Sequence, residues 1–442
     1  MPGRVIEWKL MEEMTMPTFS TAEWNGMRLH VLPTRQFKTF SIAMYIGIPL
    51  KEETVTRAAL IPHVLRRGNE RYPETKQFRE RLDDLYGAGF GFDIVKRGNY
   101  QIIILRMDVV NDAFVSGESE SLLDAALQFL SDTVTRPVLE QGAFRASYVT
   151  SEKETLRKRI EAIVNNKIQY AAERCIAEMC RDEPYRLLAL GRVDDVEDID
   201  PAGLYAVYED MLQCASIDLY IVGDTTPEAV QALLDGKFGL SGRASAVPYV
   251  PVREERRNVE EREVVERMDV KQGKLNLGLR ANVTYADDDY PAALIYNGIL
   301  GGFPHSKLFI HVRERASLAY YASSRFDGHK GLLMIQTGIE IANKEKAESI
   351  IRKQLEDIRN GVVSDDELSK TKAMIINSLR ENDDSAFDQI GYHFNSVLSG
   401  KERSKQELIE AIQATGLGSV VDIARNVELD TVYFLRDKGG AS

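Results

Sequence analysis

The six histidines come first in a search for chemistry, because imidazole is a common zinc ligand and moves protons near neutral pH. They stand at positions His30, His63, His305, His311, His329 and His393. A helical zinc hydrolase site needs two histidines four residues apart, with a glutamate beside them as the general base. The closest pair, His305 and His311, is six positions apart, so no two histidines have the required spacing. The sequence therefore lacks the usual helical zinc motif.

His63 lies in residues 54–67, a segment that we predict to be a helix. Pro62 precedes this histidine, and Arg66 and Arg67 follow it within one helical turn. Two guanidinium groups beside a bound Zn²⁺ would repel the metal ion. We therefore interpret His63 as a polar or half-buried helical residue rather than a metal ligand.

Other reaction centres find little support in the sequence. Cys175, Cys180 and Cys214 form no Cys-x-x-Cys pair, and we expect reduced structural thiols. The glycine groups at 87–91 and 298–302 lack the Lys-Ser/Thr of a nucleotide-binding loop. No Gly-x-Ser-x-Gly elbow is present to support a serine nucleophile. These observations argue against a nucleotide enzyme and a serine hydrolase.

The composition is that of a water-soluble globular protein. The 442 residues include 56 Lys and Arg against 68 Asp and Glu, which gives a net charge of −12. This acidic balance argues against nucleic acid or an anionic membrane as a general partner. No apolar run approaches the length of a membrane span, and residues 1–16 lack the apolar core of a signal peptide. We expect a cytoplasmic protein.

Short alternating segments and longer helical ones follow one another along the first half of the chain. A length of 442 residues favours at least two domains. A stretch rich in Gly, Ser, Ala and Pro, then dense in charge, spans about 239–261 and resembles a linker. Strands are predicted at 27–33, 39–48, 90–96, 101–108 and 217–223, and helices at 54–67, 74–86, 119–133, about 141–181, 202–212 and 227–234.

The second half of the sequence repeats the first with a shift of about 233–234 residues. The run Leu60-Ile61-Pro62-His63 returns as Leu294-Ile295-Tyr296-Asn297, and later segments keep the same offset. The repeat also contains a long charged helical segment from Asp365 to about Leu398. We therefore predict an α+β protein with two homologous domains, each a sheet with helices on one face. The expected ranges are 1–240 and 262–442, joined by a linker at 241–261.

A signature in the second half carries a family resemblance. Gly301-Gly302-Phe303-Pro304-His305-Ser306-Lys307-Leu308-Phe309 is followed by Val312-Arg313-Glu314-Arg315 and then Leu318-Ala319-Tyr320. This segment resembles the C-terminal domains of the pitrilysin/insulinase metallopeptidases, also called inverted zinc-motif peptidases. The resemblance and the internal repeat together cover nearly the whole chain. They imply two homologous α/β-roll domains that face each other in a clam-shell arrangement.

Active members of that family carry His-x-x-Glu-His on the first helix and a further glutamate ligand on a later long helix. When the motif is aligned with residues 59–63, Ala59 takes the position of the first histidine ligand and Pro62 that of the general base. Only His63 matches, at the position of the second histidine. The later glutamate aligns with Arg159, although Glu154 and Glu161 are close enough to be alternatives. The resemblance therefore implies an inactive peptidase homologue that binds no metal itself.

In contrast to the zinc motif, the signature in the second half matches the pattern of the family. In the family, an arginine and a tyrosine from this domain contact the substrate near zinc, and they match Arg313 and Tyr320. Gly301 and Gly302 fall near a glycine-rich substrate loop of a related non-catalytic subunit. The implied function is a subunit that binds peptide and completes the zinc site of a partner in a heterodimer, or of a second copy of itself. Two alternatives remain: Arg313 pairs with a neighbouring glutamate while Tyr320 packs on the sheet, or the protein is structural or peptide-binding without proteolysis.

Overall fold

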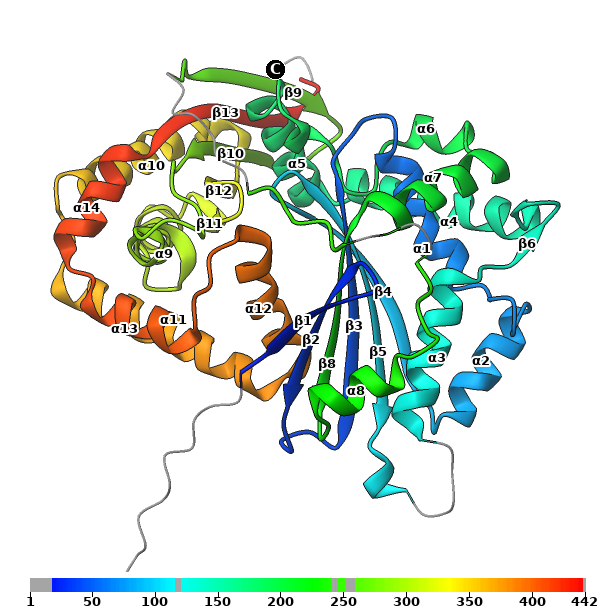
Figure 1. Cartoon of the computed structure of the whole chain (residues 1–442). Helices are drawn as coiled ribbons and strands as arrows, with labels where there is room; N and C mark the ends of the chain where they lie inside the picture. Colours follow the sequence, from blue (N-terminus) through cyan, green and yellow to red (C-terminus); the bar gives the residue numbers. More distant parts are fainter. Residues whose placement is uncertain (1–17, 116–120, 241–242, 244, 252–258, 440–442) are drawn as a thin grey trace, which may run out of the picture.

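The structure is a computed structural model that describes residues 18–115, 121–240, 243, 245–251 and 259–439. Two mixed β-sheets, each with its own layer of helices, make up the molecule (Figure 1). The predicted absence of a signal peptide concerns residues outside these ranges, as does the charge run at 253–257. Within the described ranges, no helix has both the length and the apolar character needed to cross a membrane.

The first sheet has the strand order β1-β2-β8-β3-β5-β4. All neighbouring strands are antiparallel except β2 and β8, which are parallel. Along β3 and β5, alternate residues belong to two different apolar clusters, so both faces of the sheet must be covered. The strands are β1 (Ser20–Trp24), β2 (Met27–Pro33), β3 (Thr39–Pro49), β4 (Gly89–Arg97), β5 (Tyr100–Val110) and β8 (Ser216–Gly223).

The second sheet repeats this topology with the order β11-β12-β10-β13-β9. β9 is parallel to β13, and the other neighbours are antiparallel, as in the corresponding part of the first sheet. The two homologous α+β domains predicted from the internal repeat are therefore confirmed as a fold. The strands are β9 (Arg262–Met268), β10 (Gly273–Arg280), β11 (Ala319–Asp327), β12 (Leu332–Ile339) and β13 (Glu428–Asp437).

Each domain contributes its own set of helices, and most of them cover one face of the sheet of the same domain. In the first domain they are α1 (Val55–Leu65), α2 (Thr75–Asp84), α3 (Leu122–Thr135), α4 (Ala146–Asn165), α5 (Lys167–Met179), α6 (Val193–Glu197), α7 (Pro201–Cys214) and α8 (Pro227–Leu233). In the second they are α9 (Tyr290–Asn297), α10 (Lys344–Arg359), α11 (Asp365–Glu381), α12 (Ala386–Ser399), α13 (Lys405–Ala414) and α14 (Leu417–Asn426). Two π-helical turns, η3 (Gly298–Gly302) and η4 (Phe309–Arg315), follow α9.

Both long helical segments expected from the sequence are broken. The segment at 141–181 begins with a tight turn at 141–142 and then forms α4 and α5, with Asn166 capping the start of α5. The segment from Asp365 to Leu398 divides into α11 and α12, and Ser385 accepts a hydrogen bond from the amide of Asp388. Asn and Ser side chains favour helix starts over helix interiors, because they form hydrogen bonds with nearby backbone groups.

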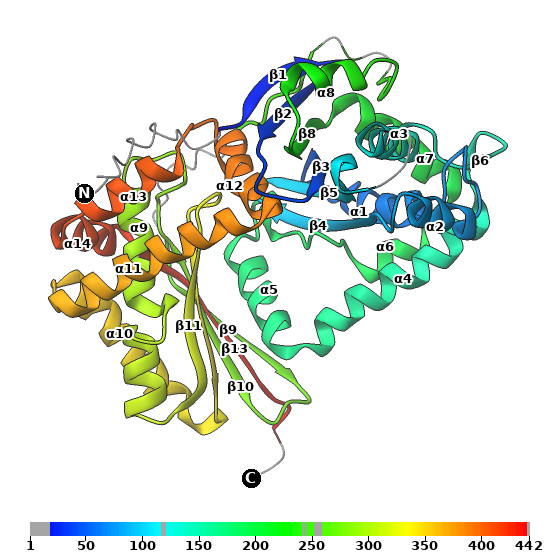
Figure 2. The same cartoon turned by 90° about the horizontal axis from the view of Figure 1, so that it is seen from below.

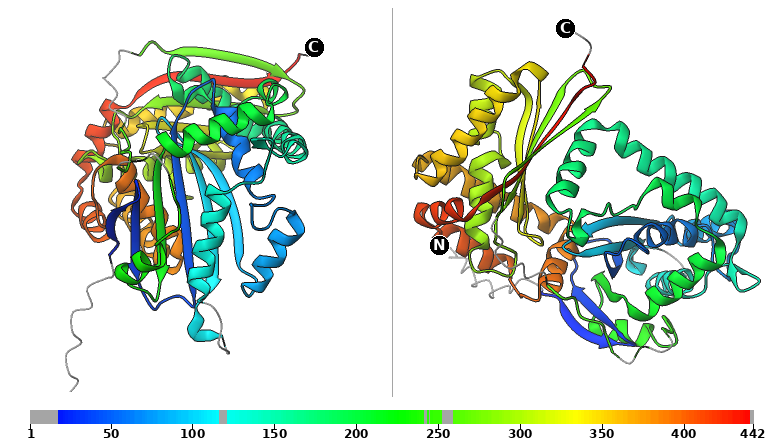
Figure 3. Two further views of the ribbon diagram at one scale, coloured as in Figure 1. Left: turned by 45° about the vertical axis from the view of Figure 1, so that its right-hand side comes forward. Right: turned by 90° about the horizontal axis from the view of Figure 1, so that it is seen from above.

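The second helix of each broken pair covers the sheet of the other domain. α5 lies between the two domains, and its Cys175 and Met179 pack on Tyr433 and neighbouring residues of the second sheet (Figures 2 and 3). α12 makes the reciprocal contact, with Ile390 and Phe394 on the outer face of the first sheet. The domains are thus interlocked, because separating them would expose an apolar face of each sheet to water.

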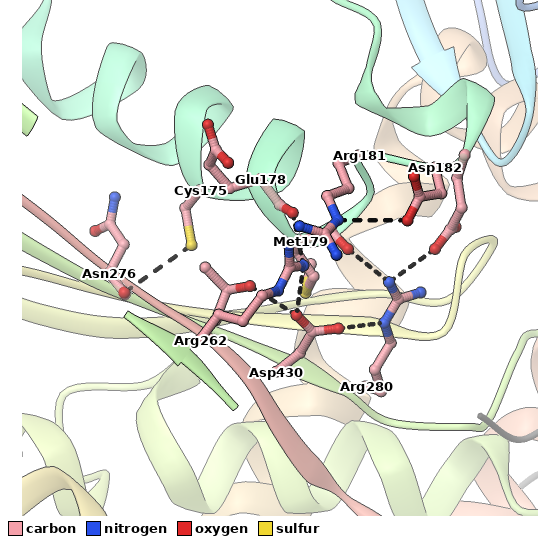
Figure 4. A network of polar contacts seen from close by, with 11 residues as sticks. Cys175, Glu178, Met179, Arg181, Asp182, Arg262, Asn276, Arg280 and Asp430 are labelled. Carbon is pink, nitrogen blue, oxygen red and sulfur yellow. Dashed lines mark hydrogen bonds and ion pairs between the residues drawn. The ribbon is translucent and has the colours of Figure 1, made fainter. Parts of the chain in front are cut away.

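A buried ion network reinforces this contact between domains (Figure 4). Arg280 of β10 binds Glu183, which follows α5, with 2.7 Å between Nη2 and Oε1. It also donates to Asp430 of β13 over 3.0 Å and to the carbonyl of Met179 over 2.8 Å. Lys330 approaches the other oxygen of Glu183 at 2.6 Å. Charges buried in this way are tolerated because they are paired.

Part of the predicted linker packs on the first sheet. Tyr249 is buried in the cluster that contains Phe394 and Tyr100. A side chain at Gly47 of β3 would collide with the Tyr249 ring, so glycine is required for this close approach. The described residues 245–251 therefore belong to the wall between the two domains rather than to a free connection.

Candidate functional site

The residues aligned with the family's zinc motif lie on α1, which faces α4. Ala59 and Pro62 are both buried, and neither side chain has an atom that could bind a metal ion. Pro62 stands inside the helix and has no amide hydrogen to donate to the carbonyl of Ala58. His63 is 1% exposed and points toward α4.

Two residues of α4 bracket the imidazole of His63. Nδ1 of His63 lies 3.4 Å from Oε2 of Glu152, and its Nε2 lies 3.3 Å from Nη1 of Arg159. Glu152 and Arg159 are separated by seven residues, which is about two helical turns, so both side chains lie on the same face of α4. Arg159 therefore lies at the imidazole, whereas Glu154, one of the two alternatives for the later ligand, pairs with Lys158 at 3.2 Å.

The protonation of this group follows from burial and from the neighbouring charges. Burial lowers the pKa of His63, and the positive charges of Arg159 and Arg66 lower it further against the opposing effect of Glu152. Burial alone would raise the pKa of Glu152, but its contacts with His63 and Arg67 outweigh this and lower it. The imidazole of His63 is therefore neutral, and the carboxylate of Glu152 beside it is ionised. The Nε2 lone pair of His63 can then accept a hydrogen bond from Arg159.

Aromatic and cationic side chains surround the imidazole. Phe92 of β4 meets His63 edge to face with 4.7 Å between ring centroids. The guanidinium carbons of Arg66 and Arg159 lie 5.3 and 5.7 Å from the centre of the same phenyl ring. Arg67 differs from them, because its Nη1 lies 3.3 Å from Oε1 of Glu152. This group is named the cation cluster below and consists of His63, Arg66, Arg67, Phe92, Glu152 and Arg159.

These residues do not fit a zinc ion. Zinc needs three protein ligands and an open position, and its catalytic water needs a base. The cluster offers one imidazole and one carboxylate, and a guanidinium lies at the remaining imidazole nitrogen. Within the described ranges, no group of three or more His, Cys, Asp or Glu side chains could hold a metal ion.

Glu152 is the residue that sequence reasoning did not single out. The family motif places a later glutamate in this helical segment but gives Glu152, two helical turns before Arg159, no role of its own. The seven-residue interval between Glu152 and Arg159 was the available signal, because such an interval repeats one helical face.

Arg313 and Tyr320 lie on the second domain, at the junction of η4 and β11. Ser317 turns the chain between them with a φ of 53°. The Arg313 side chain is 43% exposed, stacks over Phe309 at 4.5 Å and lies 3.8 Å from Glu314. Tyr320 is 61% exposed on β11, a strand at the edge of the sheet. In the described part of the chain, no hydrogen bond, ion pair or ring contact links either residue to His63.

The predicted substrate-binding glycines have different environments. Gly301 is buried, and a Cβ atom there would lie 2.4 Å from the backbone nitrogen of Ser324 on β11. Gly302 is exposed, and a Cβ atom would come within 3.2 Å of Asn297. Gly301 therefore permits close packing of η3 on β11, which is a structural requirement whether or not substrate binds there.

The duplicated α+β fold of two interlocked domains is that of a two-domain peptidase-like protein. A sequence family described as "Peptidase M16 inactive domain" matches residues 198–375. Probable inactive metalloprotease YmfF from Bacillus subtilis (strain 168) is 40% identical over 417 residues, which cover 94% of this chain and 97% of that protein. The chain belongs to the M16 peptidases, the pitrilysin/insulinase family, and the resemblance stated from its sequence is confirmed.

Two further comparisons extend over almost the whole chain. The crystal structure of a conserved protein from Enterococcus faecalis V583 matches with a TM-score of 0.85 and 31% identity, covering 96% of this chain and 100% of that one. The antilisterial bacteriocin subtilosin biosynthesis protein AlbE from Bacillus subtilis is 22% identical, over 93% of this chain and 100% of that protein. The chain is similar to both proteins over both of its domains.

Proposed function

We propose that this protein is the non-catalytic subunit of a two-chain zinc metallopeptidase. Arg313 and Tyr320 would complete the active site of a homologous partner that carries His-x-x-Glu-His and the zinc ion. The proposal rests on one contrast between the two domains. On α1 and α4, the guanidinium group of Arg159 lies where a metal ion would contact His63, whereas Arg313 and Tyr320 are exposed on the second domain.

The chemistry of these two side chains suits substrate binding. An arginine presents a fixed fork of donors that can bind a peptide carbonyl or carboxylate. A tyrosine hydroxyl can donate a hydrogen bond to the oxyanion that develops during amide hydrolysis. The 3.8 Å separation between Arg313 and Glu314 on the surface is a weak ion pair, so the guanidinium is available to another chain. The partner's zinc would polarise the scissile carbonyl, and this chain would hold the peptide.

The test uses this chain alone and in complex with a zinc-motif homologue from the same genome. We expect no stoichiometric zinc and no peptidase activity from the chain alone, but activity from the complex. Arg313→Ala with Tyr320→Phe should lower kcat/KM of the complex by about 100-fold, as loss of transition-state donors does.

Arg79→Ala with Tyr86→Phe is the matched control, because both residues are exposed and lie elsewhere on the first domain. Complex formation should be equal for both double variants when measured by size-exclusion chromatography. Zinc and activity in the isolated chain, or an undiminished rate for the Arg313/Tyr320 variant, would reject the proposal.

The second candidate is a peptide-binding or structural protein without proteolysis. The similarity to AlbE favours this candidate, because that relative is named for the biosynthesis of a bacteriocin. Under this alternative, the Arg313/Tyr320 variant would behave like the wild type in every assay of function. Substitutions on other exposed surfaces would instead impair assembly or binding.

A further inference from the structure

The two sheets differ at one edge. Each strand of the second sheet has a counterpart in the first, because the order β11-β12-β10-β13-β9 corresponds to β4-β5-β3-β8-β2. In the first sheet, β1 continues beyond β2 and pairs with it in the antiparallel direction. In the described part of the second domain, no strand follows β9 in the same way, so the sheet ends there. The place beside β9 that corresponds to β1 is therefore open to a strand from another chain.

The backbone of β9 supports this interpretation. β9 is the uppermost strand in Figure 1 and in the left panel of Figure 3. Its inner edge pairs with β13 in the parallel direction. Within the residues that the structure describes, no backbone hydrogen bond joins its outer edge to another segment. The amide and carbonyl groups of an unpaired edge can bind an added strand.

The side chains of β9 alternate between a covered face and an exposed face. On the covered face, Glu266 accepts hydrogen bonds from two residues of α5 over 2.5 and 3.0 Å. Glu263, Val265 and Arg267 alternate with it and are all exposed. Val265 in the middle is 49% exposed, which leaves an apolar side chain in water between an acid and a base.

The order of these three exposed residues is self-complementary. When two antiparallel strands pair about a central residue, the residue two places before it on one strand faces the residue two places after it on the other. A pairing of two β9 strands centred on Val265 therefore places Glu263 of each copy opposite Arg267 of the other, and the two valines meet. Opposite charges that face each other across two strands stabilise the pair.

Other registers lose this complementarity. With the centre half a residue earlier, Glu263 would face Glu266 of the other copy, and two arginines would also face each other, which is unfavourable. With the centre on Val264, Glu263 would face Val265, so the exposed face would lose both the apolar contact and the ion pairs with Arg267. Charge and apolar contact thus favour the register centred on Val265.

We propose that two copies of this protein associate by antiparallel pairing of their β9 strands, centred on Val265. The β9 strand of the second copy takes the place that β1 has in the first sheet, and a two-fold axis joins the two second-domain sheets. One pair of short strands buries less than the roughly 1,600 Å² of a standard interface, so the dimer is weak. β11 forms the opposite edge of this sheet, so the contact leaves Arg313 and Tyr320 accessible and goes beyond the function proposed above.

The experiment is sedimentation velocity of the isolated full chain from about 1 to 100 μM, the range in which weak complexes dissociate. We expect the wild type to dimerise as the concentration rises. Glu263→Arg and Arg267→Glu should each weaken the dimer by at least about tenfold, because each sets like charges against each other twice. The variant with both substitutions should dimerise again. An equal mixture of the two single variants should also dimerise, because their charges are complementary.

Asp366→Lys is the matched control, because it reverses an exposed charge of α11 in the same domain and should leave the dimer unchanged. Lys344 pairs with Glu263 at 2.7 Å but also with Glu348 at 2.9 Å, so Glu263→Arg leaves this lysine a partner. Circular dichroism checks that each variant is folded.

A wild type that stays monomeric over the whole concentration range would overturn the proposal. Single variants that dimerise as well as the wild type would do the same, and so would a double variant and a mixture that both stay monomeric. Recovery in the double variant and in the mixture would establish the register, because it requires Glu263 and Arg267 to face each other. No zinc-binding partner is present, so the result is independent of the two-chain enzyme.

Discussion

Nη1 of Arg159 lies 3.3 Å from Nε2 of the buried His63, the imidazole nitrogen left free when Nδ1 faces Glu152. A neutral imidazole uses such a lone pair either for a metal ion or for a hydrogen-bond donor. Here a positive charge of the protein itself takes that position. A divalent cation at this nitrogen would therefore meet electrostatic repulsion from the guanidinium group of Arg159.

Zinc binding should return only when the complete donor set is restored. Ala59→His, Pro62→Glu and Arg159→Glu together would supply two histidines, a carboxylate ligand and a base. We expect about one zinc per chain in this triple variant by elemental analysis after gel filtration. Arg159→Glu alone should stay well below stoichiometry, because only one histidine is present.

The matched control for the zinc experiment carries Ala59→His, Pro62→Glu and Arg159→Gln. It removes the arginine charge without supplying a carboxylate, so it should bind zinc much more weakly than the triple variant. Equal zinc content in the two variants would show that Arg159 is not at the third ligand position. Stoichiometric zinc in the wild-type protein would contradict the geometry of the whole cluster.

The ion network between the domains should contribute strongly to stability. Glu183→Gln would leave Arg280 and Lys330 buried with less negative charge beside them. Breaking one partner of a buried ion pair costs about 3–5 kcal/mol of unfolding free energy. The measurement is urea denaturation followed by circular dichroism.

Arg181→Gln provides the comparison for that experiment. Its pair with Asp182 belongs to the same region, but the two side chains are 63% and 77% exposed (Figure 4). Removing it should change the unfolding free energy by less than about 1 kcal/mol. Similar effects for Glu183 and Arg181 would mean that burial does not govern the strength of this network.

The sequence predicted that the fold is duplicated, but it did not predict how the two domains pack on each other. A repeat such as Leu60–His63 and Leu294–Asn297 indicates which elements correspond. In the structure, the order of the second sheet matches that of the first sheet without β1. Helical periodicity also shows that α5 and α12 have apolar faces. It contains no information on which sheet those faces cover, so the reciprocal packing could not be predicted.

The contacts of the candidate site could not be predicted from the sequence. The alignment could only lay the motif on Ala59, Pro62 and His63 and favour Arg159 for the later position over Glu154 and Glu161, because a motif position is local in sequence. The contact of Arg159 with His63 and the shared ring of Phe92 join three separate elements. Such contacts depend on how α1, α4 and β4 pack, which local sequence does not determine.

Acid should destabilise the protein through His393, which packs against Tyr220 at the domain interface. Burial lowers the pKa of His393 to about 4, with His30 lowering it further and Asp218 opposing. An unfolded histidine titrates near pH 6.5. Since the folded state resists protonation, stability is full above pH 6.5 and falls as pH decreases from 6.5 toward 4.

The expected loss through this histidine is on the order of 3 kcal/mol across that pH range. Urea denaturation at pH 7.0, 6.0, 5.0 and 4.5 measures it. His393→Asn should flatten the pH dependence between 6.5 and 4.5, even if it lowers stability at pH 7. An unchanged slope in the variant would assign the effect to other groups that face the interface.

Two glycine-to-alanine substitutions in the second domain should change stability in opposite directions. Gly301→Ala would place a methyl group 2.4 Å from the backbone nitrogen of Ser324, which cannot move without disturbing β11. Overpacking of this kind costs about 1–3 kcal/mol.

Gly391 lies within α12 and has no heavy atom within 4 Å of an added Cβ. Alanine there should stabilise the helix by up to about 1 kcal/mol, because glycine is a poor helix former. Thermal unfolding of both variants measures the difference, and a neutral Gly301→Ala would show that η3 does not need glycine to pack on β11.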